Sequence, residues 1–232
     1  MRFVRDVFGV EPDAWQVDAL ASIGGEPNPQ RRLCMKACTG PGKSAVLAWI
    51  GWHRLACFAS KGEHPKGAAL SITGDNLKDN LWAELSKWQA RSEFLLAAFT
   101  WTKERIYAND HAETWFLSAR SFAKDADAEA IGRALSGLHS RYPFVLLDET
   151  GDMPTAVGRA AQQIFTGSPA DALIAQAGNP TSSTGCCTSP AGVVAGRSSR
   201  SRQTQTIRSA HPASMRTMRG RSSRRTGGIT RG

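Results

Sequence analysis

The sequence predicts an α/β protein in which helices cover both faces of a mostly parallel sheet. Between residues 1 and 180, short apolar runs alternate with longer amphipathic segments. The apolar runs have the character of strands that are buried on both faces of a sheet. Strands that alternate with helices along a chain favour a parallel arrangement.

The individual elements follow from hydrophobic spacing. In the segment 76–91, for example, apolar residues recur every three or four positions, as on one face of a helix; they are Leu77, Leu81, Leu85 and Trp88. We expect helices at 13–23, 43–60, 76–91 and 125–135. We expect strands at 33–37, 68–72, 144–147 and 173–177, and a strand pair, 105–108 with 114–118, around the turn-prone Asn109-Asp110.

The charge of the chain is concentrated at its C-terminal end. The formal net charge is +9, but residues 1–185 hold 19 Lys and Arg against 20 Asp and Glu, a balance of −1. Residues 186–232 hold 10 Arg and no Lys, Asp or Glu, a balance of +10. The basic character of the chain therefore says little about its core, where a local patch would suffice to bind DNA.

Residues 186–232 also differ from the rest in composition. They contain no Phe, Trp, Tyr or Leu, so we expect them to be disordered, because they cannot bury enough apolar area to offset the entropy of ordering. One explanation is an arginine-rich arm for nucleic acid. The other, which we favour, is an out-of-frame segment, since GC-rich DNA in a shifted frame yields this composition. We therefore divide the chain into a domain, 1–185, and an Arg/Ser-rich tail, 186–232.

The sequence predicts a cytoplasmic protein that does not enter the membrane. The N-terminal residues lack the apolar run and cleavage site of a signal peptide. No stretch approaches the roughly 18 apolar residues of a spanning helix. The five cysteines are odd in number, and their spacing matches neither a metal site nor a disulfide framework, which favours a reducing compartment.

The strongest motif is the segment 37–44, Ala-Cys-Thr-Gly-Pro-Gly-Lys-Ser, between an expected strand and an expected helix. A turn of this kind directs backbone N–H groups towards phosphates, and the helix N-terminus adds a favourable dipole. We expect Lys43 to reach the β- and γ-phosphates of ATP and the Ser44 hydroxyl to bind Mg²⁺. The rest of the ATP-binding turn consists of Thr39, Gly40, Pro41 and Gly42. The pattern departs from the usual P-loop at Ala37, where the first glycine is expected.

A second motif follows the apolar run 144–147, which delivers Asp148 and Glu149 to the end of a buried strand. Open α/β sheets bind their ligands at the carboxyl ends of strands. We expect Asp148 to bind Mg²⁺ and Glu149 to activate water as a general base. A surface Asp-Glu pair that merely ends a core strand is the alternative. Together with the P-loop upstream, the pair predicts a Mg²⁺-dependent P-loop ATPase.

Two weaker candidates lie before and after these motifs. Gln16 precedes the P-loop, where its side chain can hydrogen-bond the adenine edge; a capped amphipathic helix explains the same residues. Asn179 and Thr181 follow the apolar strand 173–177, where a polar side chain can sense the γ-phosphate and couple hydrolysis to movement. An ordinary Asn-Pro turn is the alternative there.

The order of the Gln16 helix, the P-loop at 37–44, Asp148-Glu149 and the segment 178–181 resembles the ATPase domain of phage terminase large subunits. The resemblance covers roughly residues 8–185 and includes the strings Trp15-Gln16, Ser71-Ile72-Thr73-Gly74 and Leu146-Leu147-Asp148-Glu149. It implies an additional-strand, catalytic-glutamate (ASCE, RecA-like) fold that uses ATP and Mg²⁺. It also implies an oligomeric ring that pumps double-stranded DNA into a prohead, with the portal protein and the small terminase subunit as partners.

The chain departs from this family in two respects. Many relatives carry an arginine in the P-loop or just before the Asp-Glu strand, but this chain has Thr39 and Ser136 near those points, so the charge-stabilising arginine is unassigned. The family's nuclease domain needs a cluster of acidic residues, and none follows Asp171, so we expect no nuclease activity. Two alternatives stay open: a helicase-type P-loop ATPase, and a truncated remnant that binds nucleotide without turnover.

Overall fold

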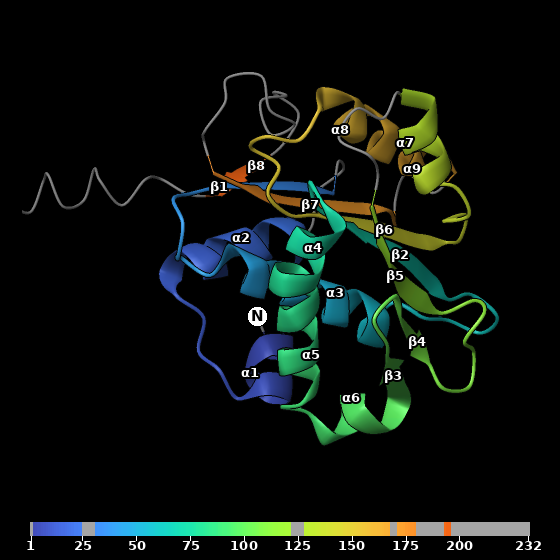
Figure 1. Ribbon diagram of the computed structural model, residues 1–232. Coiled ribbons are helices and arrows are strands. Elements are labelled where there is room, and N and C mark those ends of the chain that lie inside the picture. The colour runs from blue at the N-terminus through green and yellow to red at the C-terminus, as the bar shows by residue number, and fades with distance from the viewer. Residues whose placement is uncertain (1, 25–30, 122–127, 168–170, 180–192, 196–232) are drawn as a thin grey trace, which may run out of the picture. The chain divides into compact units, whose positions relative to one another are not determined.

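An eight-stranded sheet organises the computed structural model, which describes residues 2–24, 31–121, 128–167, 171–179 and 193–195 (Figure 1). The chain divides into two units, 1–197 and 198–232, and every described residue belongs to the first. The strand order is β3-β4-β5-β2-β6-β7-β1-β8. The strands are β1 (Arg32–Lys36), β2 (Pro65–Leu70), β3 (Phe99–Trp101), β4 (Arg105–Ala108), β5 (Phe116–Arg120), β6 (Tyr142–Leu147), β7 (Leu173–Gly178) and β8 (Val193–Ala195).

The six strands from β5 to β8 are parallel to one another, as the sequence predicts. Strands β3 and β4 extend this sheet in the antiparallel sense, and β4 pairs with β5 as the spacing around Asn109-Asp110 indicates. One strand, β7, is inserted between β1 and β6. This is the additional strand that the family resemblance implies, and it determines which loops meet at the sheet edge.

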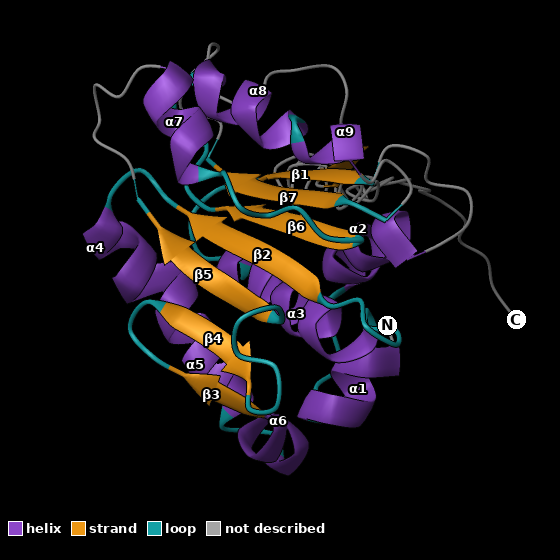
Figure 2. Cartoon of the chain, turned by 90° about the vertical axis from the view of Figure 1, so that its right-hand side faces the viewer, coloured by secondary structure: helices purple, strands orange, loops and turns teal. Residues whose placement is uncertain are grey.

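Helices cover both faces of the sheet (Figure 2). Helices α7 (Ala128–Ala134), α8 (Thr155–Gln162) and α9 (Ile164–Gly167) lie on one face. The other face carries α1 (Arg2–Phe8), α2 (Ala14–Gly24), α3 (Lys43–Cys57), α4 (Gly74–Leu77), the π-helical turn η1 (Lys78–Trp82), α5 (Ala83–Gln89) and α6 (Glu93–Ala98).

The central strands are largely apolar because both of their faces are buried. In β6, Val145 and Leu147 pack towards α7 and α8, whereas Phe144 and Leu146 belong to the larger cluster around α3. All four side chains have no exposed surface. This explains why the run 144–147 is continuously apolar instead of alternating with polar residues.

One described strand, β8, lies within the segment 186–232, for which the sequence predicts disorder. Leu33 of β1 pairs with Val193 and Met35 pairs with Ala195. Two adjacent β-branched valines suit a strand, and this strand pairs with the outer edge of β1. The remainder of the predicted tail lies outside the described residues.

Five further elements were not predicted: α1, α6, β3, α8 and α9. The predicted helix 76–91 is present, but the π-helical turn η1 interrupts it between α4 and α5. Cys34 of β1 is disulfide-bonded, whereas Cys38 and Cys57 are free. None of the described helices has the length and apolar character needed to cross a membrane.

A close contact between β2 and β6 generates the first prediction. Gly67 pairs with Phe144, and a Cβ atom at Gly67 would lie 2.3 Å from the Phe144 ring. We expect Gly67→Ala to lower the free energy of unfolding by about 1–3 kcal/mol, because the ring has no room to retreat in a packed core. Denaturant unfolding measures the change.

Gly132 on α7 provides the matched control, since a Cβ there meets nothing within 4 Å. Gly132→Ala is expected to leave stability unchanged or raise it slightly, because alanine favours a helix. Equal stability of the Gly67→Ala variant and the wild type would contradict this account of the core.

Candidate functional site

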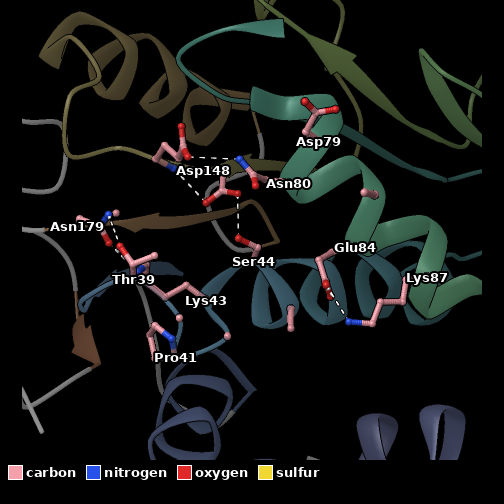
Figure 3. A pocket seen from close by; sticks show the side chains of 16 residues that line it. Thr39, Pro41, Lys43, Ser44, Asp79, Asn80, Glu84, Lys87, Asp148 and Asn179 are labelled. Carbon is pink, nitrogen blue, oxygen red and sulfur yellow. Dashed lines mark hydrogen bonds and ion pairs between the residues drawn. The ribbon is translucent and has the colours of Figure 1, made fainter. Parts of the chain in front are cut away.

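The carboxyl ends of three neighbouring strands, β6, β7 and β1, meet at one edge of the sheet. The loops that follow them line a cavity of about 710 Å³ together with one side of η1 and α5 (Figure 3). Nearly all the residues predicted for the site lie on it. The lining consists of Thr39, Gly40, Pro41, Gly42, Lys43, Ser44, Ala45, Asp79, Asn80, Ala83, Glu84, Lys87, Asp148, Glu149, Gly178 and Asn179.

The loop after β1 has the backbone shape that a phosphate site requires. Gly40 and Gly42 have φ values of 93° and 88°, in the left-handed region that glycine adopts without strain. Helix α3 then begins at Lys43, so its first N–H groups and its positive dipole end face the cavity. The backbone of this loop can therefore bind an anion by itself, without a contribution from side chains.

Lys43 is the first residue of α3, and its ammonium group extends back to the loop. Its Nζ donates to the carbonyl oxygens of Ala37 at 2.9 Å and Cys38 at 2.6 Å, and to Asn179 Oδ1 at 2.9 Å. Partial burial lowers the pKa of Lys43, and the nearby Asp148 opposes this shift. The ammonium group is thus held in place from both the β1 side and the β7 side.

Asn179 connects the end of β7 to the P-loop, as its predicted coupling role requires. Besides accepting from Lys43, it donates through Nδ2 to Thr39 Oγ1 at 3.3 Å (Figure 3). A side chain in this position is suited to respond to the group that Lys43 binds. Thr181, the second residue predicted for coupling, lies outside the described residues.

Ser44 and Asp148 form the candidate metal site. Ser44 Oγ donates to Asp148 Oδ2 at 3.1 Å, although the two residues are 104 positions apart in the sequence. A hydroxyl and a carboxylate are the oxygen ligands that Mg²⁺ prefers, and Mg²⁺ commonly takes its other ligands from phosphates and water. Within the described ranges, no cluster of three His, Cys, Asp or Glu residues offers another metal site.

Asp148 is a buried carboxyl group, with only 3% of its surface exposed. Burial raises its pKa because desolvation penalises the charged form. Hydrogen bonds from the Ser44 hydroxyl and from the backbone N–H of Glu149 oppose this shift, and Lys43 adds a weaker attraction. The site therefore holds a carboxylate in surroundings that an added cation would stabilise.

Glu149 is held by two side chains that the sequence analysis missed. Asn76 of α4 donates to Glu149 Oε2 at 2.7 Å, and Asn80 of η1 donates to Oε1 at 3.3 Å. Thr73 caps α4 through a hydrogen bond from the Asn76 N–H, which fixes the start of the helix beside the glutamate. The spacing of four residues between two asparagines on one helix was the only signal of this role.

The backbone of Glu149 is strained. Its φ of 57° lies in the left-handed region, which a residue with a Cβ seldom adopts. Such strain is concentrated at functional sites, where the surrounding structure maintains it. Here the surrounding contacts hold the carboxylate in the cavity beside Asp148.

Gln16 lies behind the P-loop instead of lining the cavity. Its side chain is 7% exposed, and its Oε1 accepts a hydrogen bond from the Asp13 N–H at 2.9 Å. Its Nε2 lies 3.0 Å from the position that a Cβ on Gly42 would occupy. The residue therefore packs against the loop, and its contact with adenine stays a prediction.

No arginine lines the described cavity. Arg133 pairs with Glu129 on α7, and Arg141 pairs with Asp171, so each is engaged elsewhere. Ser136 donates to the Arg133 carbonyl oxygen. Among the residues that line the described cavity, the cations are Lys43 and Lys87, and Lys87 pairs with Glu84.

The chain has the fold of phage large terminases. It is similar to the HK97 bacteriophage large terminase, with a TM-score of 0.54 and 14% identity over 77% of this chain and 36% of that one. It is also similar to the ATPase domain of the Thermus phage P74-26 large terminase, with a TM-score of 0.53 and 16% identity over 74% of this chain and 67% of that one.

A third similar structure is the large terminase of the thermophilic bacteriophage D6E, with a TM-score of 0.51 and 11% identity over 73% of this chain and 39% of that one. The same D6E protein in complex with ADP gives a TM-score of 0.50 at 12% identity over 73% of this chain and 38% of that one. The chain thus spans little more than a third of the HK97 and D6E proteins. No family model and no curated protein sequence matches it.

The raised pKa of Asp148 generates a prediction about stability. A carboxyl group whose pKa is higher in the folded protein favours folding at low pH, and this contribution is lost as the pH rises through the raised value. At neutral pH the charged Asp148 therefore opposes folding. We expect Asp148→Asn to raise the melting temperature at pH 7, and the difference from wild type to disappear in acid.

Thermal unfolding between pH 3 and pH 8 measures this effect. The matched control is Asp110→Asn in the exposed β4–β5 turn, which is expected to leave the melting temperature unchanged. A variant at Asp148 that is less stable than wild type at pH 7 would show that the hydrogen bonds to the carboxylate outweigh its desolvation.

Proposed function

We propose that this protein is a Mg²⁺-dependent ATPase and that it acts as the motor domain of a DNA-packaging terminase. One observation carries the proposal: Lys43, Ser44, Asp148, Glu149 and Asn179 line one cavity, although they come from three separate segments of the chain. Their residue types match the needs of phosphoryl transfer to water. The terminase fold of the chain is consistent with this activity.

Binding of the triphosphate depends on the P-loop. The backbone N–H groups of the loop and of the first turn of α3 would bind the phosphates, and Lys43 adds a positive charge. Ser44 and Asp148 would hold Mg²⁺, which would offset the negative charge of the phosphates. Asn179 contacts the same ammonium group and is therefore placed to respond to the γ-phosphate.

Glu149 supplies the base. In the hydrolysis step a water oxygen attacks the γ-phosphorus, the bond to the ADP oxygen breaks, and a proton of the water passes to the Glu149 carboxylate. Asn76 and Asn80 donate to both carboxylate oxygens and so restrict the orientation of the base. The strained backbone at Glu149 serves the same purpose, since it directs the side chain away from the strand axis and into the cavity.

We propose that this hydrolysis drives the movement of double-stranded DNA into a prohead. The proposal rests on the similarity of the fold to large terminases and on the shared order of motifs. We further propose that the complete motor is a homo-oligomeric ring, with the portal protein and the small terminase subunit as partners.

The role of Glu149 is tested by Glu149→Gln, which keeps the size of the side chain but removes the base. We expect ATP turnover to fall by about 10²–10⁴-fold while ATP binding is retained. Lys43→Ala is expected to lose ATP binding itself, because the loop loses its central charge. Phosphate release measures turnover, and calorimetric titration with Mg·ATP measures binding.

The matched control is Glu104→Gln on the exposed β3–β4 turn, which should match wild type in both measurements. Turnover at the wild-type rate in the Glu149→Gln variant would exclude this residue as the base. A wild-type chain that binds ATP but releases no phosphate, even at high protein concentration and with DNA, would favour the remnant that binds nucleotide without turnover.

The two asparagines make a graded prediction. Removal of the shorter hydrogen bond, in Asn76→Ala, is expected to lower kcat by about ten-fold with little change in KM, because one hydrogen bond to a charged group contributes about 1.5–3 kcal/mol. Asn80→Ala should have a smaller effect, since its contact with Glu149 is longer. Steady-state kinetics measures both constants. An unchanged kcat in both variants, or a change in KM alone, would contradict the assignment.

A further inference from the structure

We propose that Thr150 is a positioning residue that links Asn179, at the end of β7, to Glu149, at the end of β6. The inference rests on the proposed function and adds a route by which the two sides of the site affect each other. Thr150 directly follows Glu149, yet it has no exposed surface and does not line the cavity. It can therefore act on the reaction only through its neighbours.

Thr150 is attached to β7 by two hydrogen bonds to the same atom. Its backbone N–H donates to the Ala177 carbonyl oxygen at 2.9 Å, and its Oγ1 donates to the same oxygen at 3.0 Å. The turn that begins at Glu149 is thereby held to the last residues of the neighbouring strand. A residue without a hydroxyl group at position 150 would keep the backbone bond and lose the second one.

Gly178 brings the two loops closer than any other residue would permit. A Cβ atom at Gly178 would lie 2.6 Å from Thr150 Oγ1 and 2.7 Å from the backbone N of Gly151. Real Cβ atoms essentially never make such contacts, and a backbone atom cannot turn aside as a flexible side chain can. The end of β7 and the turn after Glu149 are therefore in direct contact, with no space between them.

The same stretch of β7 leads directly to the P-loop. The Gly178 carbonyl oxygen accepts a hydrogen bond from the Ala37 N–H at 3.4 Å. The next residue, Asn179, contacts Lys43 and Thr39. A change at the phosphate-binding loop that moves Asn179 must then also move Ala177 and Gly178, and with them Thr150.

Glu149 has little freedom to absorb such a movement. Its backbone is already in the left-handed region, and its carboxylate accepts hydrogen bonds from Asn76 and Asn80. A shift of Thr150 is therefore transmitted to the carboxylate. Because misplacement of a reacting group by about 1 Å can cost about 10²-fold in rate, this contact is able to tune hydrolysis.

The test uses Thr150→Val, which has nearly the same shape but lacks the hydroxyl, and Thr150→Ser, which keeps it. We expect Thr150→Val to lower kcat by about ten-fold and to change KM for ATP by less than about two-fold, because substrate binding does not involve this residue. Thr150→Ser should restore most of the rate. A valine variant with wild-type kcat, or a serine variant as slow as valine, would overturn the proposal.

Gly178→Ala tests the same contact from the other side, and decides the question should Thr150→Val fail to fold. Its Cβ must push the turn away from β7, so we expect a loss of kcat with ATP binding retained. Gly132→Ala, where a Cβ meets nothing within 4 Å, is the matched control and should behave as wild type. Wild-type kcat in Gly178→Ala would also overturn the proposal.

Hydrogen–deuterium exchange separates this inference from the proposed ATPase activity. In the wild type and Thr150→Ser, Mg·ATPγS is expected to slow exchange of the backbone amides at 148–152, and in Thr150→Val this slowing should be lost. This difference between the variants does not require ATP hydrolysis. If the chain binds nucleotide without hydrolysing it, the proposed function fails, but the link through Thr150 is still supported. Unchanged exchange at 148–152 in the wild type with bound nucleotide would refute the link.

Discussion

The placement of β7 between β1 and β6 is the constraint on which the rest of the site depends. Parallel strands end at the same edge of a sheet, so the P-loop, the Asp-Glu pair and Asn179 are brought together by strand order alone. The hydrogen bond from Ser44, after β1, to Asp148, after β6, is one result of this arrangement.

The site is built at a cost in stability that the sheet offsets. It contains a buried carboxyl group whose pKa is raised by desolvation, and a glutamate in a left-handed backbone conformation. Such features persist only where the surrounding structure restrains them. The restraint comes from the mostly buried strands β6 and β7, from the capped start of α4, and from the attachment of Thr150 to β7.

Hydrophobic pattern and turn chemistry were sufficient to predict the main elements of the fold. The runs 33–37, 144–147 and 173–177 are strands within a residue or two, because both of their faces are buried and their character is mainly apolar. The short elements α1, α6 and β3 have no comparable signal, since tertiary contacts stabilise them more than their own sequence does. Strand β8 was not predicted for a different reason. Its three residues contribute little to the average composition of the long polar segment in which they lie.

The sequence by itself determined the residues to which we assign the chemistry: Lys43 and Ser44 in a glycine-containing turn, and Asp148 and Glu149 at the end of a buried strand. These are local patterns, and local physics makes them recognisable. Only the tertiary structure decided their surroundings. Asn76 lies 73 positions from the Glu149 that it holds, and Gly178 meets Thr150 because β6 and β7 are neighbours. Contacts of that kind depend on strand order and close packing, for which a single sequence carries no local signal.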